Sequence, residues 1–349
     1  MERKLASCRI ISDIKPIEGA DKIELAVVDG WKVVVAKDVG HKVGDLVIYC
    51  EIDSFLPIRE EFEFLRKSSY KKMGDQEGFR LRTIKLRGQV SQGLILPISV
   101  LNPPDTNIYV EPFVGLDVTE MLDIVKYEPP IPAELAGKVK GSFPSFIPKT
   151  DEERVQNLAS EYEEYKLQSK HKFYVTEKLD GSSATFYYKD GEFGVCSRNL
   201  ELLETEGNTF WKVARELDLE NKMRRFGKSI SLQGELIGEG IQGNPYKIKG
   251  HTVKFFTGYE INEQKRIPFV NFVALLQDME LDYVPILNHE YGLLLPGFLL
   301  PHTVDDMLKY AEGKSALNPE TEREGVVVRS IDGTISFKAI SNKFLLNEK

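Results

Sequence analysis

The stretch Val175–Ser183 contains the side chains best suited to covalent chemistry. Its alternating β-branched residues predict a strand that breaks at Asp180-Gly181, a pair typical of turns. Lys178 then lies at the strand end, and Asp180 follows two residues later, so both side chains can point to one face. A lysine amine held in such a pocket is a nucleophile once it loses its proton. The alternative is an exposed strand lysine before an ordinary hairpin turn, because Asp-Gly turns are common.

The elements that follow this stretch carry further charged residues at or near strand ends. A predicted hairpin, 184–196, leads to Arg198. An apolar strand at 230–238 presents Glu235, and an aromatic strand follows at 253–261. Glu324 is the first residue of a strand at 324–329, and the last strand, 334–340, carries Lys338. Taken singly, a strand Glu or Lys is usually a satisfied or solvated residue, so only the combination indicates a site.

Length and composition limit the class of protein. The chain has 349 residues, of which 42% are hydrophobic and 29% charged, which suggests two soluble globular domains. No apolar run approaches the roughly 20 residues that cross a bilayer, and the N-terminus lacks the apolar core of a signal peptide. We therefore expect a cytoplasmic protein with no membrane contact. The three cysteines are far apart, so they indicate neither a disulfide framework nor a zinc site.

The first part of the chain predicts a small β-barrel. Residues 1 to about 105 read as short strands separated by turn signals such as Asp29-Gly30. This pattern resembles an oligonucleotide/oligosaccharide-binding (OB) barrel. The net charge of −8 means that nucleic acid must bind at local basic patches. One such patch is formed by Arg80, Arg82, Lys85 and Arg87. Its concentrated charge favours a groove that follows a phosphate backbone, and the alternative is a solvated strand face.

A segment rich in proline and glycine, 102–148, predicts the connection between the domains and a surface arm. A capping-box pattern at Thr150–Glu153 then predicts the start of a helix. Lys149 and Arg154 flank its first turn and, on sequence alone, read as ordinary surface charges.

The charged motifs occur in the same order as motifs I, Ia, III, IIIa, IV and V of the covalent nucleotidyltransferases, the superfamily of DNA ligases, RNA ligases and capping enzymes. They are Lys178-Leu179-Asp180-Gly181, Ser197-Arg198-Asn199, Gly234-Glu235-Leu236, the strand through Tyr259, Glu324-Gly325-Val326-Val327, and Lys338. Each motif is weak alone, but six in one order within one domain rarely agree by chance.

The domain order narrows the resemblance. Capping enzymes and most DNA ligases carry their OB domain after motif V, whereas the barrel pattern comes first here. The chain therefore resembles the ATP-dependent RNA ligases built as an N-terminal OB domain followed by a nucleotidyltransferase domain. This implies an α+β protein of two domains. The first is an OB-like nucleic-acid-binding barrel with a connecting arm, 1–128, and the second, 129–349, has antiparallel sheets flanked by helices.

The resemblance also implies the chemistry. Lys178 would attack the α-phosphorus of ATP and form lysyl-AMP. AMP would then pass to a 5′-phosphorylated RNA end, and a 3′-hydroxyl would displace it. Lowering the lysine pKa by three units from near 10.4 corresponds to about 4 kcal/mol. A divalent metal, Mg²⁺ or Mn²⁺, favours the neutral amine, and Asp180, Glu235 and Glu324 would hold it directly or through its waters.

The remaining residue roles also follow from the resemblance. Besides Lys178, the implied catalytic residues are Asp180 and Lys338, with Lys338 at the α-phosphate and Arg198 at a phosphate or the ribose. The other implied nucleotide contacts are Glu177, Glu235, Glu324, Lys343, and Phe256 or Tyr259 stacked on adenine. Lys149 and Arg154 would contact pyrophosphate. The RNA ligases commonly have Lys-x-Lys in motif V, whereas Ile340 holds the second position here, so Lys343 is the candidate substitute.

The implied partner is RNA with 3′-hydroxyl and 5′-phosphate ends, in a nicked duplex, bound by a monomer. Two other functions are considered. A DNA ligase or capping-type guanylyltransferase fits the motifs but not the domain order. A non-catalytic OB-type RNA-binding protein with a decayed second domain conflicts with the intact Lys178, Glu235 and Lys338.

Overall fold

The computed structural model describes residues 4–102, 110–128, 137–167, 173–290, 293–294 and 298–347. The chain divides into two compact units. The first contains Met1–Pro130, Val155–Glu163 and Leu345–Lys349, and the second contains Ile131–Arg154 and Glu164–Phe344. The domain boundary expected between residues 128 and 129 lies at the edge of the segment 129–136, which is outside the described residues.

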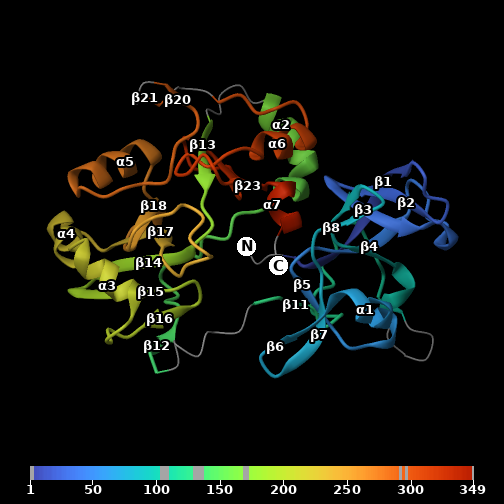
Figure 1. Ribbon diagram of the computed structural model, residues 1–349, viewed down its shortest axis with the longest axis horizontal. Helices are drawn as coiled ribbons and strands as arrows, with labels where there is room; N and C mark the ends of the chain where they lie inside the picture. The colour runs from blue at the N-terminus through green and yellow to red at the C-terminus, as the bar shows by residue number, and fades with distance from the viewer. Residues whose placement is uncertain are drawn as a thin grey trace. The chain divides into compact units, whose positions relative to one another are not determined.

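The first unit is built from short antiparallel strands (Figure 1). They are β1 (Ala6–Pro16), β2 (Ile23–Val28), β3 (Trp31–Ala36), β4 (Leu46–Cys50), β5 (Ser54–Pro57), β6 (Tyr70–Met73), β7 (Gln76–Arg80), β8 (Ile84–Leu86), β9 (Gln89–Ser91), β10 (Leu94–Pro97) and β11 (Val125–Lys126). The five-stranded sheet has the order β10-β4-β1-β2-β3, and its outer strands β10 and β3 contact each other. The sheet is therefore curled, as the sequence predicts.

Strand β1 allows this curl because it pairs with two neighbours in turn. Its first half pairs with β4 and its second half with β2, and the register shifts between Ile11 and Asp13. Such a bulge bends a strand and increases its twist. A second sheet, β11-β5-β7-β6, and the short helix α1 (Arg66–Ser69) complete the unit. Its apolar core includes Ile48, Leu56, Phe62 and Phe79, all fully buried.

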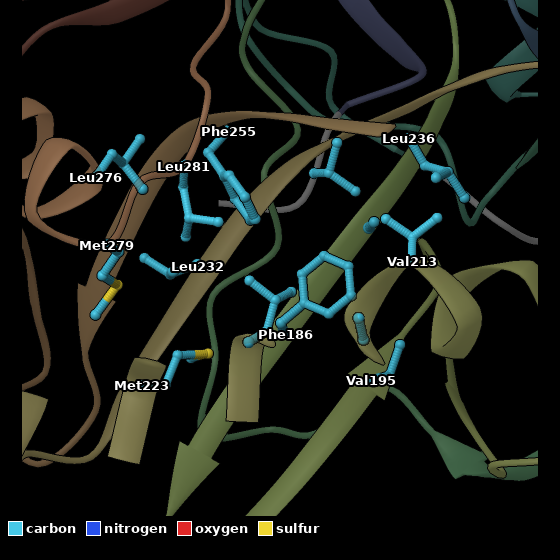
Figure 2. Packing of buried hydrophobic residues seen from close by; sticks show 14 of the residues in the cluster. Phe186, Val195, Val213, Met223, Leu232, Leu236, Phe255, Leu276, Met279 and Leu281 are labelled. Carbon is cyan, nitrogen blue, oxygen red and sulfur yellow. The ribbon is translucent and has the colours of Figure 1, made fainter. Parts of the chain in front are cut away.

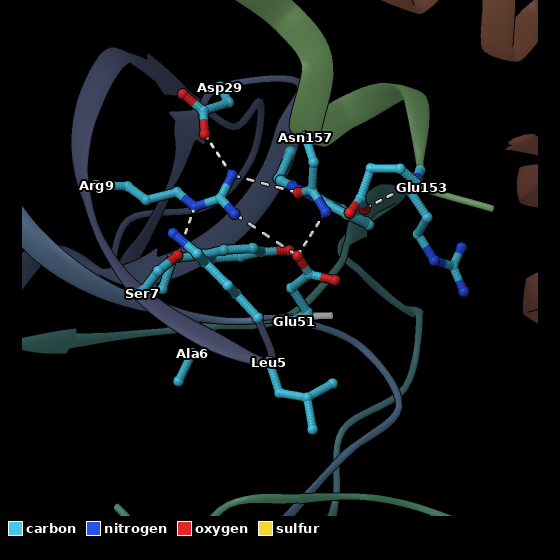
Figure 3. Close-up of polar contacts among 12 residues, drawn as sticks. Leu5, Ala6, Ser7, Arg9, Asp29, Glu51, Glu153 and Asn157 are labelled. Carbon is cyan, nitrogen blue, oxygen red and sulfur yellow. Dashed lines mark hydrogen bonds and ion pairs between the residues drawn. The ribbon is translucent and has the colours of Figure 1, made fainter. Parts of the chain in front are cut away.

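A later segment of the chain belongs to this first unit and is held by a polar cluster (Figure 3). The Asn157 side chain donates to a Glu51 carboxylate oxygen at 2.6 Å and accepts from the Trp31 indole at 2.6 Å. Arg9 pairs with Glu51, whose side chain is 1% exposed, and with Asp29. Asn157 lies in the 3₁₀ helix η5 (Val155–Leu158), so these bonds attach η5 to the barrel.

The second unit contains a seven-stranded sheet with the order β12-β16-β15-β14-β17-β18-β19. Its strands are β12 (Val139–Ser142), β14 (Ser182–Lys189), β15 (Glu192–Cys196), β16 (Leu200–Leu202), β17 (Ile230–Gly238), β18 (His251–Glu260) and β19 (Lys265–Arg266). The hairpin predicted at 184–196 is confirmed as β14–β15, and it turns at Asp190-Gly191, where both residues have positive φ.

Helices α3 (Thr209–Glu216), α4 (Leu219–Phe226) and α5 (Phe269–Asp278) cover this sheet. The core between them includes Phe186, Leu232 and Phe255 from the strands and Met223 and Leu276 from the helices (Figure 2). Asn208 caps α3 by accepting the Phe210 and Trp211 N–H groups. The sheet is thereby a rigid base for the residues at its strand ends.

A three-stranded sheet, β13-β22-β23, is the other main sheet of this unit. Its strands are β13 (Phe173–Lys178), β22 (Gly325–Ser330) and β23 (Ser336–Ile340). The short strands β20 (His289–Glu290) and β21 (Leu293–Leu294) pair with each other. Helix α6 (Val304–Ala311) contacts β23, and α7 (Asn342–Asn347) follows it. No helix among the described residues is long and apolar enough to cross a membrane.

The prediction that a helix starts at Thr150 is wrong. Residues 150–153 are irregular, and helical structure begins with η5 and continues as α2 (Ala159–Leu167). The carboxylates that suggested a capping box bind elsewhere: Asp151 pairs with Lys338, and Glu152 pairs with Arg329. These ion pairs hold the segment beside β23, and the Lys338 N–H donates to the Glu153 carbonyl at 2.7 Å.

Candidate active site

The site forms around Lys178, the last residue of β13. The strand register places Lys178 opposite Gly325, the first residue of β22, so Glu324 lies immediately beside the lysine. The Lys178 amine lies 2.7 Å from each Glu324 carboxylate oxygen. Gly325 permits this close packing, because a Cβ there would lie 2.3 Å from the Ala339 carbonyl oxygen of β23. The sequence thus brings motifs I and IV together through one antiparallel pairing.

Two more carboxylates lie near enough to raise the pKa of the same amine. Asp180 follows β13 in the turn, and Glu235 lies on β17, where its neighbour across the sheet is Ser183. Gly181 lets the Glu235 side chain approach the turn closely, because a Cβ there would lie 2.8 Å from the Glu235 Cγ. Burial, together with the charges of Glu324 and Asp180, raises the pKa of Glu235 to about 8, although Lys178 acts in the opposite direction. The buried site therefore disfavours the ionised form of Glu235.

The Lys178 amine is a cation in this arrangement. Burial lowers its pKa, but the charges of Glu324, Glu235 and Asp180 together outweigh burial, so the pKa lies above the ordinary value. Its side chain is 29% exposed, so a ligand can reach the amine. The amine becomes a nucleophile when the surrounding negative charge is neutralised, because its pKa then falls.

Lys338 lies on the same face of the three-stranded sheet as Lys178. It pairs across β22 with Val327, which pairs with Thr176, two residues before Lys178. Cross-strand partners and residues two apart share one face of a sheet. The Lys338 amine donates to an Asp151 carboxylate oxygen at 2.9 Å, and Arg198 binds the other oxygen at 3.3 Å. Lys338, predicted to bind the α-phosphate, and Arg198, predicted to bind a phosphate or the ribose, therefore meet at one carboxylate.

The segment 149–154 also carries the two residues predicted to contact pyrophosphate. Lys149 is exposed and donates to the Asn199 side chain at 3.1 Å, next to Arg198. Arg154 is buried and forms a parallel bridge with Lys338. Both therefore lie beside predicted nucleotide-binding residues.

Lys343 is the candidate substitute for the lysine missing at Ile340, and the structure places it beside Glu312. Its amine pairs with Glu312 at 3.0 Å, and its side chain is 61% exposed. A hydrogen bond and the charge of Glu312 raise the Lys343 pKa. Ile340 itself is buried opposite Gly325. The structure thus holds Lys343 at Glu312 rather than at Asp151.

The residues predicted to contact adenine fall into two places. Phe256 packs on an apolar cluster that includes Leu179 and Tyr246, next to the lysine motif. Tyr259 packs with Tyr187 and Ile147 in a different cluster. The environment of Phe256 therefore fits adenine stacking better than that of Tyr259.

Glu177 lies on the face of β13 opposite to Lys178, because adjacent strand residues alternate. It is 1% exposed, and its Oε2 accepts the Ala316 N–H at 2.7 Å. Its buried Oε1 has no hydrogen-bond partner among the described residues. Burial raises the Glu177 pKa, and bonds from Ser315 and Ala316 offset this only in part. A buried acceptor without a donor is unusual and marks a place for a ligand N–H or a water.

Two residues that position the lysine motif were not predicted from the sequence, and both lie on the loop after β17. The Tyr246 hydroxyl accepts the Asp180 N–H at 2.6 Å, and the Gln242 amide donates to the Gly181 carbonyl at 3.3 Å. Gln242 has a positive φ of 47°, an uncommon conformation for a side-chain-bearing residue. The polar run Gln242–Tyr246 is the sequence feature that could have indicated these two residues, but its spacing does not predict a contact with Asp180.

The residues of the basic patch predicted for the first unit differ in how far they are exposed. Arg80 is buried, pairs with Asp53 at 3.4 Å and lies 4.4 Å from the Tyr127 ring centre. Arg82 is partly buried between β7 and β8. Lys85 and Arg87 are exposed on β8 and on the turn after it. Only Lys85 and Arg87 are thus fully available to a polyanion.

Comparison with known proteins adds independent findings. A family model described as RNA ligase matches residues 171–343, and one described as an OB-fold domain matches residues 5–98. No curated protein sequence matches the chain.

Solved structures of an RNA ligase from Naegleria gruberi are similar along almost the whole chain. A substituted variant with AMP and Mn shares 42% identity over 99% of each chain, with a TM-score of 0.88. Another variant, with ATP and Mn, shares 42% identity over 99% of each chain, with a TM-score of 0.87. The ligase with pyrophosphate shares 42% identity over 99% of this chain and 98% of that one, with a TM-score of 0.87. These matches confirm the predicted OB fold and two-domain class, and the chain belongs to the RNA ligase family.

Proposed function

We propose that this RNA ligase joins a 3′-hydroxyl to a 5′-phosphate RNA end by way of a lysyl-AMP intermediate on Lys178. The observation that carries the proposal is the Lys178 amine held at 2.7 Å by Glu324, with the charges of Glu235 and Asp180 also acting on it. The Naegleria gruberi ligase, 42% identical, was solved with ATP, AMP and Mn, which supports ATP as the substrate and a divalent metal as cofactor.

In the first step, the Lys178 nitrogen forms a bond to the α-phosphorus of ATP, and pyrophosphate leaves with the electrons of the broken P–O bond. The amine must first lose a proton, which its raised pKa opposes. Lys338 shares the Lys178 face of the sheet and can stabilise charge on the α-phosphate. Lys149 and Arg154 lie next to Arg198 and Lys338, where the leaving pyrophosphate would pass.

The carboxylates fit a divalent metal by their charge. Burial, together with the charges of Glu324 and Asp180, raises the pKa of Glu235 to about 8, and a bound cation would favour its ionised form. Among the described residues, no three His, Cys, Asp or Glu side chains are grouped closely enough to bind one metal directly. We therefore assign Asp180, Glu235 and Glu324 to contacts that include the waters of the ion, as Mg²⁺ favours. The metal would neutralise charge and so favour the uncharged amine.

Adenine recognition is assigned to Phe256 and Glu177. Phe256 packs with Leu179 and Leu317, and Leu317 follows Ala316, whose N–H binds Glu177. An adenine ring on Phe256 could thus present its 6-amino group to the unpartnered Glu177 Oε1. Guanine has a carbonyl at that position, so this contact would favour ATP over GTP.

The later steps transfer AMP from Lys178 to the 5′-phosphate of RNA and then release it when the 3′-hydroxyl attacks. We propose a nicked RNA duplex as the substrate, with Lys85 and Arg87 of the first unit contacting its backbone. Both residues are exposed, which suits electrostatic contacts to phosphate.

The test is incubation with α-labelled ATP and Mn²⁺ or Mg²⁺, followed by denaturation and measurement of protein-bound label. Label from the α-position but not the γ-position should remain on the protein, and it should move to the 5′ end when nicked RNA is added. Parallel reactions with GTP and with DNA 3′ ends separate the alternatives. Retention of guanylate, or a preference for DNA ends, would support a capping-type or DNA-ligase activity instead.

A further inference from the structure

The Asp151 carboxylate contacts two cationic side chains of the candidate site, Lys338 and Arg198. One of its carboxylate oxygens accepts from the Lys338 amine at 2.9 Å, and the other accepts from Arg198 at 3.3 Å. The chain directly after it is held in place, because Glu152 pairs with Arg329 at 2.7 Å and the Glu153 carbonyl accepts the Lys338 N–H at 2.7 Å. The carboxylate therefore sits between two cations on an anchored segment.

A phosphate group bound by Lys338 and Arg198 would make contacts of the same kind as the Asp151 carboxylate. Two oxygens of one anion bind two different cations, and both bonds are charge-assisted. Lys338 has a side-chain exposure of only 10%, so its ammonium group needs an anionic partner when no nucleotide is bound. An α-phosphate cannot take both cations while Asp151 remains between them, because two anions at this distance repel each other.

We propose that Asp151 is an internal counter-anion of the phosphate subsite: it binds Lys338 and Arg198 in the nucleotide-free enzyme and is displaced when ATP binds. The inference rests on the proposed function, in which Lys338 contacts the α-phosphate. The carboxylate competes with the nucleotide for these cations and so weakens nucleotide affinity. It also re-forms both bonds when AMP leaves, which speeds release of the spent nucleotide.

The competing role is a positioning one, in which Asp151 stays bound to Lys338 throughout and orients it. The two roles predict opposite effects of removing the charge. A competitor that is removed lets ATP bind more tightly, whereas a lost positioning group makes ATP bind more weakly or slows adenylylation.

The experiment compares Asp151→Asn and Asp151→Ser with the unchanged protein. Equilibrium binding of ATP and of pyrophosphate is measured, together with KM and kcat for lysyl-AMP formation. Both variants should bind ATP and pyrophosphate on the order of tenfold more tightly, as expected when ATP no longer breaks a charge-assisted pair. KM for ATP should fall accordingly, and multiple-turnover sealing should slow because the nucleotide leaves more slowly.

Glu320→Gln is the matched control, because it removes one negative charge from an exposed ion pair with Lys247 in the same unit. Its ATP affinity should stay unchanged. Unchanged or weaker ATP binding by both Asp151 variants overturns the inference. This outcome is separate from a failure of the proposed function, which would appear as absence of lysyl-AMP in the unchanged protein.

Discussion

In the first unit, the buried Glu51 carboxylate meets the Arg9 guanidinium and the Asn157 amide, whereas in the second unit one Lys178 amine faces three carboxylates. The first cluster joins η5 to the barrel, a structural role, through Arg9 between Glu51 and Asp29. In the second, burial first and then the charges of Glu324 and Asp180 raise the pKa of Glu235 to about 8. Groups with strongly shifted pKa values concentrate at functional sites. The comparison indicates that a buried carboxyl with a strongly raised pKa beside a lysine, rather than a buried ion pair as such, marks the catalytic centre.

The largest expected effect is from Lys178→Ala, which should reduce covalent AMP to background because the attacking nitrogen is gone. Sealing of a pre-adenylylated RNA strand should survive, since only the first step uses this amine. Lys254→Ala is the matched control, because Lys254 also pairs with a carboxylate, Asp282 at 2.7 Å, in the same unit. Label measurement on denatured protein checks both. Covalent AMP on the Lys178 variant would place the nucleophile elsewhere.

The next effect concerns the three carboxylates. Glu235→Ala, Glu324→Ala and Asp180→Ala should each slow adenylylation by about a hundredfold or more, because preorganised charge is lost. Stability should respond differently from rate. The free energy of unfolding of Glu235→Gln should not fall, since the substitution relieves repulsion from Glu324 and Asp180. Single-turnover rates and urea unfolding test the two halves. Rates near those of the unchanged enzyme in all three variants would make these carboxylates structural.

The order of motifs predicted the fold class and the RNA ligase family, because strand-end Lys, Asp and Glu residues keep a fixed order along the chain. Register was harder to predict: nothing in the sequence states that Lys178 lies opposite Gly325. The capping-box pattern at Thr150 misled, because Asp151 and Glu152 form tertiary ion pairs that a local rule does not consider. Likewise, composition cannot show that Arg80 is buried on Asp53.

The Glu51 cluster should respond in stability rather than in rate. Glu51→Ala removes a buried carboxylate partner of both Arg9 and Asn157, so unfolding should become easier by about 3 kcal/mol. Lysyl-AMP formation per folded molecule should be unchanged, because the first unit contains none of the proposed nucleotide contacts. Denaturant unfolding and active-site titration measure these quantities. A loss of adenylylation without a loss of stability would contradict the comparison.

The pH dependence of stability provides a smaller test. The folded Glu235 carboxyl has a pKa of about 8 against a usual value of 4.5, so the folded state holds a proton that the unfolded state has already lost between these pH values. The contribution to stability is therefore present at low pH and is lost as pH rises through this range. Glu235→Gln should show a shallower decline in unfolding free energy between about pH 5 and 8 without metal. Parallel curves for the two proteins would show that Glu235 is already ionised.

The smallest effect is expected at the exposed basic residues of the first unit. Lys85→Glu with Arg87→Glu should weaken binding of nicked RNA and leave lysyl-AMP formation intact, since both side chains are exposed and the chemistry lies in the second unit. Each lost phosphate contact should reduce the slope of log affinity against log salt by about one. Arg80→Gln serves as the contrast: Arg80 is buried on Asp53, so its substitution should lower stability rather than the salt slope. The test is the RNA affinity of each variant measured at several salt concentrations. An unchanged slope in the double variant would place the RNA on another face of the barrel.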